Sequence, residues 1–296
     1  MMKGIFLTAT VVLALSLTSA DAAAQAKPVQ IGIATTFLNG RSKSVVEIAA
    51  DDFKGVLKKI ADLDGELLSH YDATEIALKL KNKQLDLGIF HGHEFAWMQK
   101  KYPELLPLMI AVNKHREDRA CVIVHKDSPA KSVADLRGKK IDMPADVSEI
   151  SRVFLQKYTT PMANQGLDAF FGAIVNSSSP TAALDDVARR KVDAAIVGTI
   201  GLEFYKEVKG PVFEKNLKIL QQSASFPPVV IVYRPGKLEE TTLNQFRDGL
   251  LRAHKSDEGR DMMKTWNIET FELIPKDYNK SLAEVLKAYP PPVLLR

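Results

Sequence analysis

Short apolar runs alternate with helix-spaced apolar residues along most of the chain. The runs predict strands at 29–35, 66–68, 85–90, 106–112, 119–125 and 140–143. Apolar residues three and four positions apart predict helices at 44–60, 74–82, 94–101, 151–158 and 181–190. Alternation of this kind is typical of α/β domains, so we expect mostly parallel sheets with helices on both faces.

Two apolar stretches stand out by what precedes them. The stretch 119–125 follows the charged loop 113–118, and the stretch 229–233 follows Pro227 and Pro228. We interpret both as hinge crossovers between two lobes. This predicts a first lobe of residues 27–118 and 228–296 and a second lobe of residues 119–227, with a ligand held in the crevice between them.

The first 26 residues predict export. Lys3 precedes an uncharged apolar run, and small residues follow up to Ala24 or Ala26, which is the pattern of a cleavable signal peptide. The apolar run is shorter than the roughly 20 residues that span a bilayer, and no cysteine lies near the cleavage site to carry a lipid. We therefore expect a periplasmic protein.

Charge and cysteine content narrow the function further. The formal net charge is +4, and basic residues are mixed with acidic ones, so we expect no nucleic-acid partner. Cys121 is the single cysteine, which excludes a disulfide within the chain. Its apolar surroundings indicate a small buried residue, with a thiolate ligand as the alternative.

A polar turn follows the predicted strand 85–90, whose last residue, Phe90, is a candidate ligand contact together with the turn. His91 and His93 alternate on an extended segment, so their rings point to one side. With Glu94 or Glu149 opposite, they are candidates to hold a metal or an acidic ligand, and the alternative is that both simply line a loop. A zinc-protease helix is excluded, because no second histidine follows three residues after Glu94.

A series of segments in the same order resembles the periplasmic substrate-binding proteins of phosphonate-type transporters. The segments are DATEI at 72–76, KQLDLG at 83–88, GHEFA at 92–96, HKDS at 125–128, SVADLRGK at 132–139 and KVDAA at 191–195. The resemblance implies the type 2 periplasmic binding fold, with two lobes and a ligand between them.

The resemblance also implies site residues. The family holds an anion at a helix start that matches 144–151 here, where Ser148 fits the pattern but Glu149 and Ile150 replace hydroxyl residues. We therefore expect a bare dianion to bind weakly, and the histidines with glutamate favour a cationic, metal-bound or protonated ligand. Phe37 matches the aromatic residue at the cleft mouth, and Ser177, Ser178 and Thr199 stand at two further strand ends.

These observations predict an exported solute-binding protein that captures a small polar or oxyanion ligand and delivers it to an ABC permease. The alternatives are a protein that presents its ligand to a membrane sensor kinase, for example arsenite bound through Cys121, and a periplasmic metal-handling protein. We expect a monomer without cofactor or enzymatic activity, because the chain has neither a Gly-x-Ser-x-Gly elbow nor a phosphate-binding loop.

Overall fold

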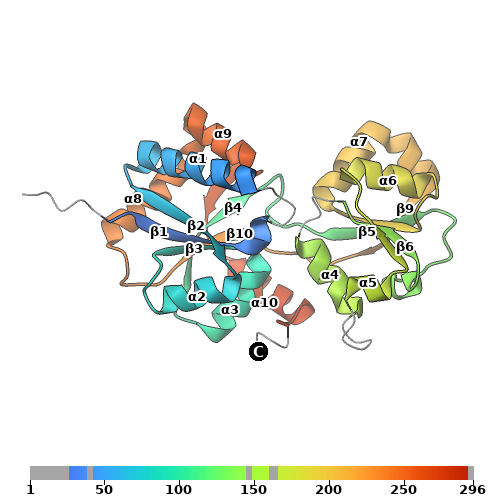
Figure 1. Cartoon of the computed structure of the whole chain (residues 1–296), viewed down its shortest axis with the longest axis horizontal. Helices are drawn as coiled ribbons and strands as arrows, with labels where there is room; N and C mark the ends of the chain where they lie inside the picture. The colour runs from blue at the N-terminus through green and yellow to red at the C-terminus, as the bar shows by residue number, and fades with distance from the viewer. Residues whose placement is uncertain (1–26, 39–42, 145–148, 160–165, 293–296) are drawn as a thin grey trace, which may run out of the picture.

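The computed structural model describes residues 27–38, 43–144, 149–159 and 166–292. The predicted signal peptide and Ser148 lie outside these ranges. Within them, no helix is both long enough and apolar enough to cross a membrane. The chain forms two bodies that lie side by side, each built on its own sheet (Figure 1).

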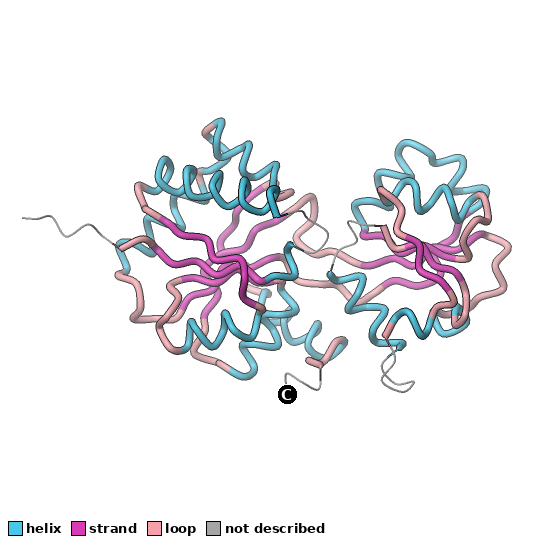
Figure 2. The backbone as a smooth tube through the Cα atoms, viewed as in Figure 1, coloured by secondary structure: helices cyan, strands magenta, loops and turns pink. Residues whose placement is uncertain are grey.

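The first lobe, as we use the term, is the six-stranded sheet with the helices packed on it. Its strand order is β11-β4-β10-β3-β1-β2. The strands are β1 (Val29–Ala34), β2 (Gly65–Tyr71), β3 (Leu87–Phe90), β4 (Leu106–Val112), β10 (Val229–Tyr233) and β11 (Thr270–Leu273). Helices cover both faces of this sheet (Figure 2): α1 (Lys43–Ala61), α8 (Glu240–Leu251) and α9 (Asp257–Thr265) on one face, and α2 (Ala73–Lys81), α3 (Gly92–Lys101) and α10 (Tyr278–Ala288) on the other.

The second lobe is the five-stranded sheet with its helices. Its strand order is β7-β6-β8-β5-β9. The strands are β5 (Ala120–His125), β6 (Lys140–Asp142), β7 (Ala173–Val175), β8 (Ala194–Gly198) and β9 (Leu217–Gln222). One face carries α6 (Pro180–Ala188) and α7 (Thr199–Asn216), and the other carries α4 (Glu149–Thr159) and α5 (Leu167–Phe170).

The α/β architecture with two lobes is confirmed, but the sheets are mixed rather than mostly parallel. Strand β10 is antiparallel to both β3 and β4, and β5 is antiparallel to both β8 and β9. Parallel pairing joins β1 to β2 and β3, and β6 to β7 and β8. β10 and β5 are the strands that the chain forms directly after it crosses from the other lobe, and each is antiparallel to both of its neighbours.

The two strands that we interpreted as crossovers are interior members of their sheets, so that interpretation was wrong for the strands themselves. The chain crosses just before each of them, in residues 113–119 and 223–228. These crossing segments pair with each other: the Asp118 N–H donates to the Phe226 carbonyl (3.2 Å), and the Phe226 N–H donates to the Asp118 carbonyl (2.9 Å). Each apolar run begins only after the crossing, because the segment that passes between the lobes is charged in one case and contains two prolines in the other.

The core does not stop at the crossing. One apolar cluster includes Phe95 of the first lobe and Phe154 of the second, together with Phe226 and Tyr289 near the crossing. The rings of Phe226 and Tyr289 stack with centroids 4.7 Å apart. The two lobes therefore share packed apolar contacts near α3, α4 and α10.

Candidate functional site

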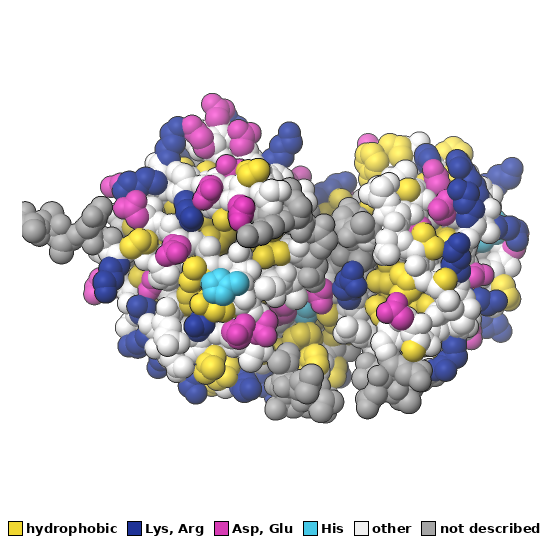
Figure 3. Space-filling view, in the orientation of Figure 1, with side chains coloured by type: hydrophobic (Ala, Val, Ile, Leu, Met, Phe, Trp, Pro, Cys, Tyr) yellow, Lys and Arg dark blue, Asp and Glu magenta, His cyan; other side chains and the backbone are white. Residues whose placement is uncertain are grey.

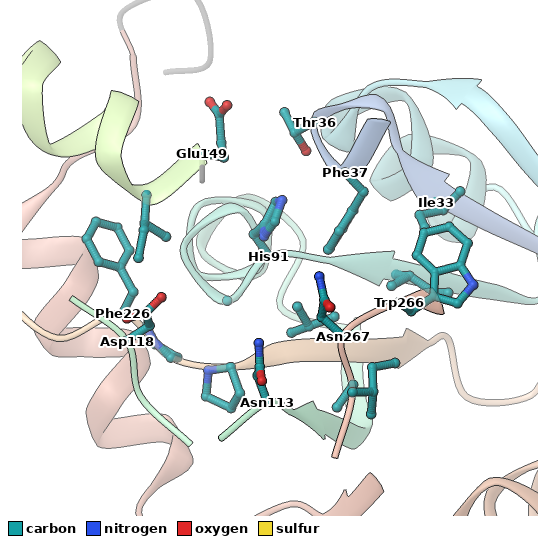
Figure 4. Close-up of a pocket in the computed structure, with 18 of the residues that line it drawn as sticks. Ile33, Thr36, Phe37, His91, Asn113, Asp118, Glu149, Phe226, Trp266 and Asn267 are labelled. Atoms are coloured by element: carbon teal, nitrogen blue, oxygen red, sulfur yellow. The ribbon is translucent and has the colours of Figure 1, made fainter. Parts of the chain in front are cut away.

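A cavity of about 590 Å³ lies between the two lobes. Its wall is formed by the 3-10 helix η1 (Thr35–Leu38), the β3–α3 turn, both crossing segments and the start of α4. The surface is hollowed between the two bodies in the space-filling view (Figure 3), and Figure 4 shows the labelled side chains around the cavity. The volume falls within the roughly 300–1,000 Å³ of ordinary small-molecule sites.

The β3–α3 turn is a capped helix start. His91 is the N-cap residue of α3, and its N–H donates to the Glu94 carboxylate (3.1 Å). Thr36 also donates to Glu94, with 2.8 Å between the oxygens. At Gly92 a Cβ atom would lie 2.5 Å from the Pro227 carbonyl oxygen, so only glycine lets the second crossing segment approach this closely.

Aromatic contacts fix the orientation of the two imidazoles. The rings of Phe37 and His91 stack with centroids 3.8 Å apart. His93 is 1% exposed and meets Trp97 and Phe226 edge-on at 5.0 and 5.5 Å. Both histidines line the cavity, and no described residue offers a hydrogen-bond partner to the buried atoms His91 Nε2 and His93 Nδ1. Buried polar atoms are rarely left unpaired, so these two indicate a ligand.

Burial also sets the protonation states of the turn. Desolvation lowers the pKa of His91 to about 3 and lowers the pKa of His93 well below its usual value. Desolvation raises the pKa of Glu94 to about 7, although the hydrogen bonds from Thr36 and His91 oppose the rise. At neutral pH each imidazole is therefore uncharged and carries one N–H donor.

The first crossing segment supplies polar and charged residues that the sequence marked only as a charged loop. Asn113, His115, Arg116 and Asp118 line the cavity. His115 Nε2 lies 2.9 Å from the Glu203 carboxylate of α7, and Arg116 Nε lies 2.7 Å from the Glu272 carboxylate of β11. The charged loop at 113–118 was the signal in the sequence that could have identified these cavity residues. A segment that crosses between two lobes must pass the cleft that separates them.

The second lobe contributes the start of α4 and the loop after β7. Glu149, the first residue of α4, lines the cavity together with Ile150 and Ser178. The negative charge of Glu149 helps to raise the pKa of Glu94. The structure thus places five of the candidate ligand contacts in one cavity wall: Phe37, His91, His93, Glu149 and Ser178.

The other predicted site residues that lie within the described ranges do not line the cavity. Phe90 is fully buried in the core, because strand alternation turns it away from Ile89, which does line the cavity. Glu94 lies behind the wall, bonded to Thr36 and His91. The Ser177 hydroxyl donates to Asp142, and the Thr199 hydroxyl bonds to the Arg119 backbone. Both hydroxyls are therefore hydrogen-bonded within the second lobe and the crossing segment. Ser148 lies outside the described residues.

Cys121 is not a cleft residue, which contradicts the alternative of arsenite bound through its thiol. It is 0% exposed and packs in the apolar cluster under α6 and α7, and the Gln222 amide lies 3.4 Å from its sulfur. Burial raises the pKa of the thiol, so the nucleophilic thiolate is disfavoured. Among the described residues, no group of three or more His, Cys, Asp or Glu side chains is placed to hold a metal ion.

The substitution Cys121→Ser tests this placement. We expect unchanged ligand affinity, because the side chain does not reach the cavity, and a loss of about 1–3 kcal/mol in the free energy of unfolding from burying a hydroxyl. Chemical denaturation and calorimetric titration measure the two quantities. Lost affinity with intact stability would contradict the placement of Cys121.

Two mixed α/β lobes with a cavity between them define the class of type 2 periplasmic binding proteins. Solved structures of this fold cover most of the chain. A binding protein component of an ABC phosphonate transporter from Pseudomonas aeruginosa has 18% identity and a TM-score of 0.55, over 87% of this chain and 85% of that one. PhnD1 from Prochlorococcus marinus in complex with methylphosphonate has 16% identity and a TM-score of 0.55, over 88% and 97%. XAC2383 from Xanthomonas citri bound to ATP has 15% identity and a TM-score of 0.56, over 88% and 96%.

The sequence itself places the chain in a family. Residues 36–278 match the family described as ABC transporter, phosphonate, periplasmic substrate-binding protein, and the chain belongs to that family. No curated protein sequence matches significantly. This match confirms the family resemblance that the short segments indicated. The family is described as periplasmic.

Proposed function

We propose that this protein captures a phosphonate-type oxyanion in its singly ionised, hydroxyl-bearing form and delivers it to an ABC permease. The observation that carries the proposal is the pair of buried, unpaired imidazole nitrogens, His91 Nε2 and His93 Nδ1, in the wall of the cavity between the lobes. Family membership supplies the class of ligand.

The charges around the cavity explain the choice of ionisation state. Both imidazoles are neutral at pH 7, so they offer hydrogen bonds without positive charge. Asp118 and Glu149 line the same cavity, and the Arg116 guanidinium is already paired with Glu272. A dianion would be repelled by the carboxylates, whereas a monoanion can donate its hydroxyl hydrogen to one of them.

Closure of the two lobes completes the proposed site. The boundaries predicted at 118/119 and 227/228 fall beside the backbone bridge between Asp118 and Phe226. Rotation about this bridge would bring the start of α4, with Glu149, towards His91 and Phe37 on the first lobe. Hinge motion of this kind is common in binding proteins with two lobes.

Calorimetric titration with methylphosphonate at several pH values tests the proposal. We expect the affinity to fall about tenfold for each pH unit above the second ionisation of the ligand, since only the monoanion binds. The substitution Glu149→Gln should raise the affinity at high pH on the order of tenfold, because it removes one repelling carboxylate. Small-angle scattering of the same samples should show compaction upon binding.

The matched control is Glu284→Gln on α10, an exposed glutamate away from the cavity, which should leave the affinity unchanged. Methylphosphonate, phosphite and phosphate that all fail to bind at acidic and neutral pH would contradict the proposed function. Affinity that rises with pH would contradict the proposed ionisation state.

A further inference from the structure

The cavity continues from its polar end into the first lobe as an apolar chamber. We use this name for the part lined by Ile33, Phe53, Ile89, Ile231, Met262 and Trp266. Figure 4 shows Ile33 and Trp266 at the end of the cavity that lies away from Glu149 and Phe226. The chamber therefore extends beyond the groups that would bind an oxyanion.

The floor of the chamber is a row of neighbours across the sheet. Ile89 of β3 pairs with Ile33 of β1 on one side and with Ile231 of β10 on the other. Ile89 is only half-buried although β3 is an interior strand of the sheet. Interior strand residues are normally covered by a packed helix, so this exposure marks a space over Ile89. The space narrows towards Ile33 and Ile231, which are both 2% exposed.

Closure of the lobes would not fill this space. Phe53 belongs to α1, Met262 belongs to α9, and Trp266 follows α9 directly, so every wall of the chamber comes from the first lobe. A rotation between lobes narrows the polar end, where Glu149 and Ser178 face the first lobe, and leaves the chamber unchanged.

The polar end and the chamber meet at the stacked pair of Phe37 and His91. A head group bonded to His91 Nε2 thus lies at the mouth of an apolar space. Empty apolar space has no stabilising contacts of its own, and apolar surface that enters it gains roughly 25 cal/mol per Å² buried.

We propose that the physiological ligand is amphiphilic: an oxyanion head group with an aliphatic or aryl substituent of several carbons, the substituent occupying the apolar chamber. This inference rests on the proposed function for the head group and adds the class of substituent. It makes the chamber the part of the site that determines specificity among oxyanions that share one head group.

Titration with the n-alkylphosphonates from methyl to octyl, each below its micelle concentration, tests the inference. We expect the affinity to rise about fourfold for each methylene that enters the chamber, and to level off once the chamber is full. The intrinsic fluorescence of Trp266 should change with octylphosphonate and not with methylphosphonate. The variant Trp266→Phe, which retains Trp97, assigns that signal.

A variant that fills the chamber locates the substituent. Ile231→Phe should abolish the rise in affinity with chain length, whereas the control Val232→Ile on the opposite face of β10 should keep the rise. If Ile231→Phe does not fold, the Trp266 signal in the unsubstituted protein decides the question.

The possible outcomes separate the two proposals. Methylphosphonate that binds as tightly as octylphosphonate overturns the chamber inference and leaves the proposed function standing. A chain-length effect with no Trp266 response, and unchanged in a folded Ile231→Phe variant, also overturns it, because the substituent then lies elsewhere. A folded protein that binds no member of the series overturns the proposed function and the inference with it.

Discussion

The free energy of unfolding is expected to reach its maximum near pH 6.5 and to fall on both sides, owing to three titratable groups of the β3–α3 turn. The pKa of Glu94 is about 7 in the folded protein and 4.5 in the unfolded chain. From pH 4.5 to 7 the folded state therefore holds a proton that the unfolded state has lost, and stability falls as the pH rises, by about 3 kcal/mol in total.

The histidines act in the opposite sense. The pKa of His91 is about 3 in the folded protein against 6.5 in the unfolded chain, and that of His93 is lowered as well. Below pH 6.5 the unfolded state binds protons that the folded state does not, so their contribution to stability is present above pH 6.5 and is lost as the pH falls. Two histidines outweigh one glutamate between pH 4.5 and 6.5, which places the maximum near pH 6.5.

The substitution Glu94→Gln isolates the glutamate. We expect equal stability of variant and unsubstituted protein below pH 4.5, and a variant more stable by up to about 3 kcal/mol above pH 7, since the amide still accepts hydrogen bonds but has no charge to desolvate. Urea denaturation at half-unit pH intervals measures this difference.

The matched control is Glu75→Gln. Glu75 occupies the equivalent capping position of α2, where its carboxylate accepts from the Asp72 N–H (3.0 Å), but it is exposed. The free energy of unfolding of Glu75→Gln, plotted against pH, should be parallel to that of the unsubstituted protein. A Glu94→Gln curve that is also parallel between pH 4.5 and 7 would show that Glu94 is charged in the folded state.

Replacing His93 by phenylalanine is expected to stabilise the protein and to weaken ligand binding. The ring lies among Trp97, Phe226 and His91, which suits a phenyl group, and the substitution removes the unpaired Nδ1. Removing a buried unsatisfied polar atom should raise the free energy of unfolding by about 1–3 kcal/mol. Losing a hydrogen bond to the oxyanion should weaken binding by about 1–3 kcal/mol.

This pairing of effects separates a ligand-binding histidine from a structural one. We expect the control His254→Phe, at an exposed position after α8, to change neither quantity appreciably. Thermal denaturation and calorimetry with methylphosphonate at pH 6 measure them. A His93→Phe protein that is less stable and binds with unchanged affinity would show that His93 serves packing alone.

Local apolar spacing was sufficient to predict several strands and helices. The strand predicted at 106–112 is observed with those bounds, and the helix predicted at 74–82 is observed at Ala73–Lys81. Both predictions rest on apolar spacing, and the second is reinforced by the capping box of Asp72 and Glu75. The sequence predicted mostly parallel sheets, but β5 and β10 are antiparallel to their neighbours. Their direction depends on how the chain crosses between the lobes, which local apolar spacing does not show.

The sequence by itself determined the α/β class and the family. It also indicated Phe37, His91, His93, Glu149 and Ser178 as candidate ligand contacts, because strand ends and helix starts are local features that a ligand site uses, and all five line the cavity. Only the tertiary structure decided which neighbours of these residues face the cavity. It turned Phe90 into the core, placed Cys121 under α6 and α7, and brought Asp118 and Trp266 to the same cavity from distant segments. Those placements follow from sheet order and lobe crossing, which bring residues far apart in sequence together and leave no mark in the local pattern of apolar and polar positions.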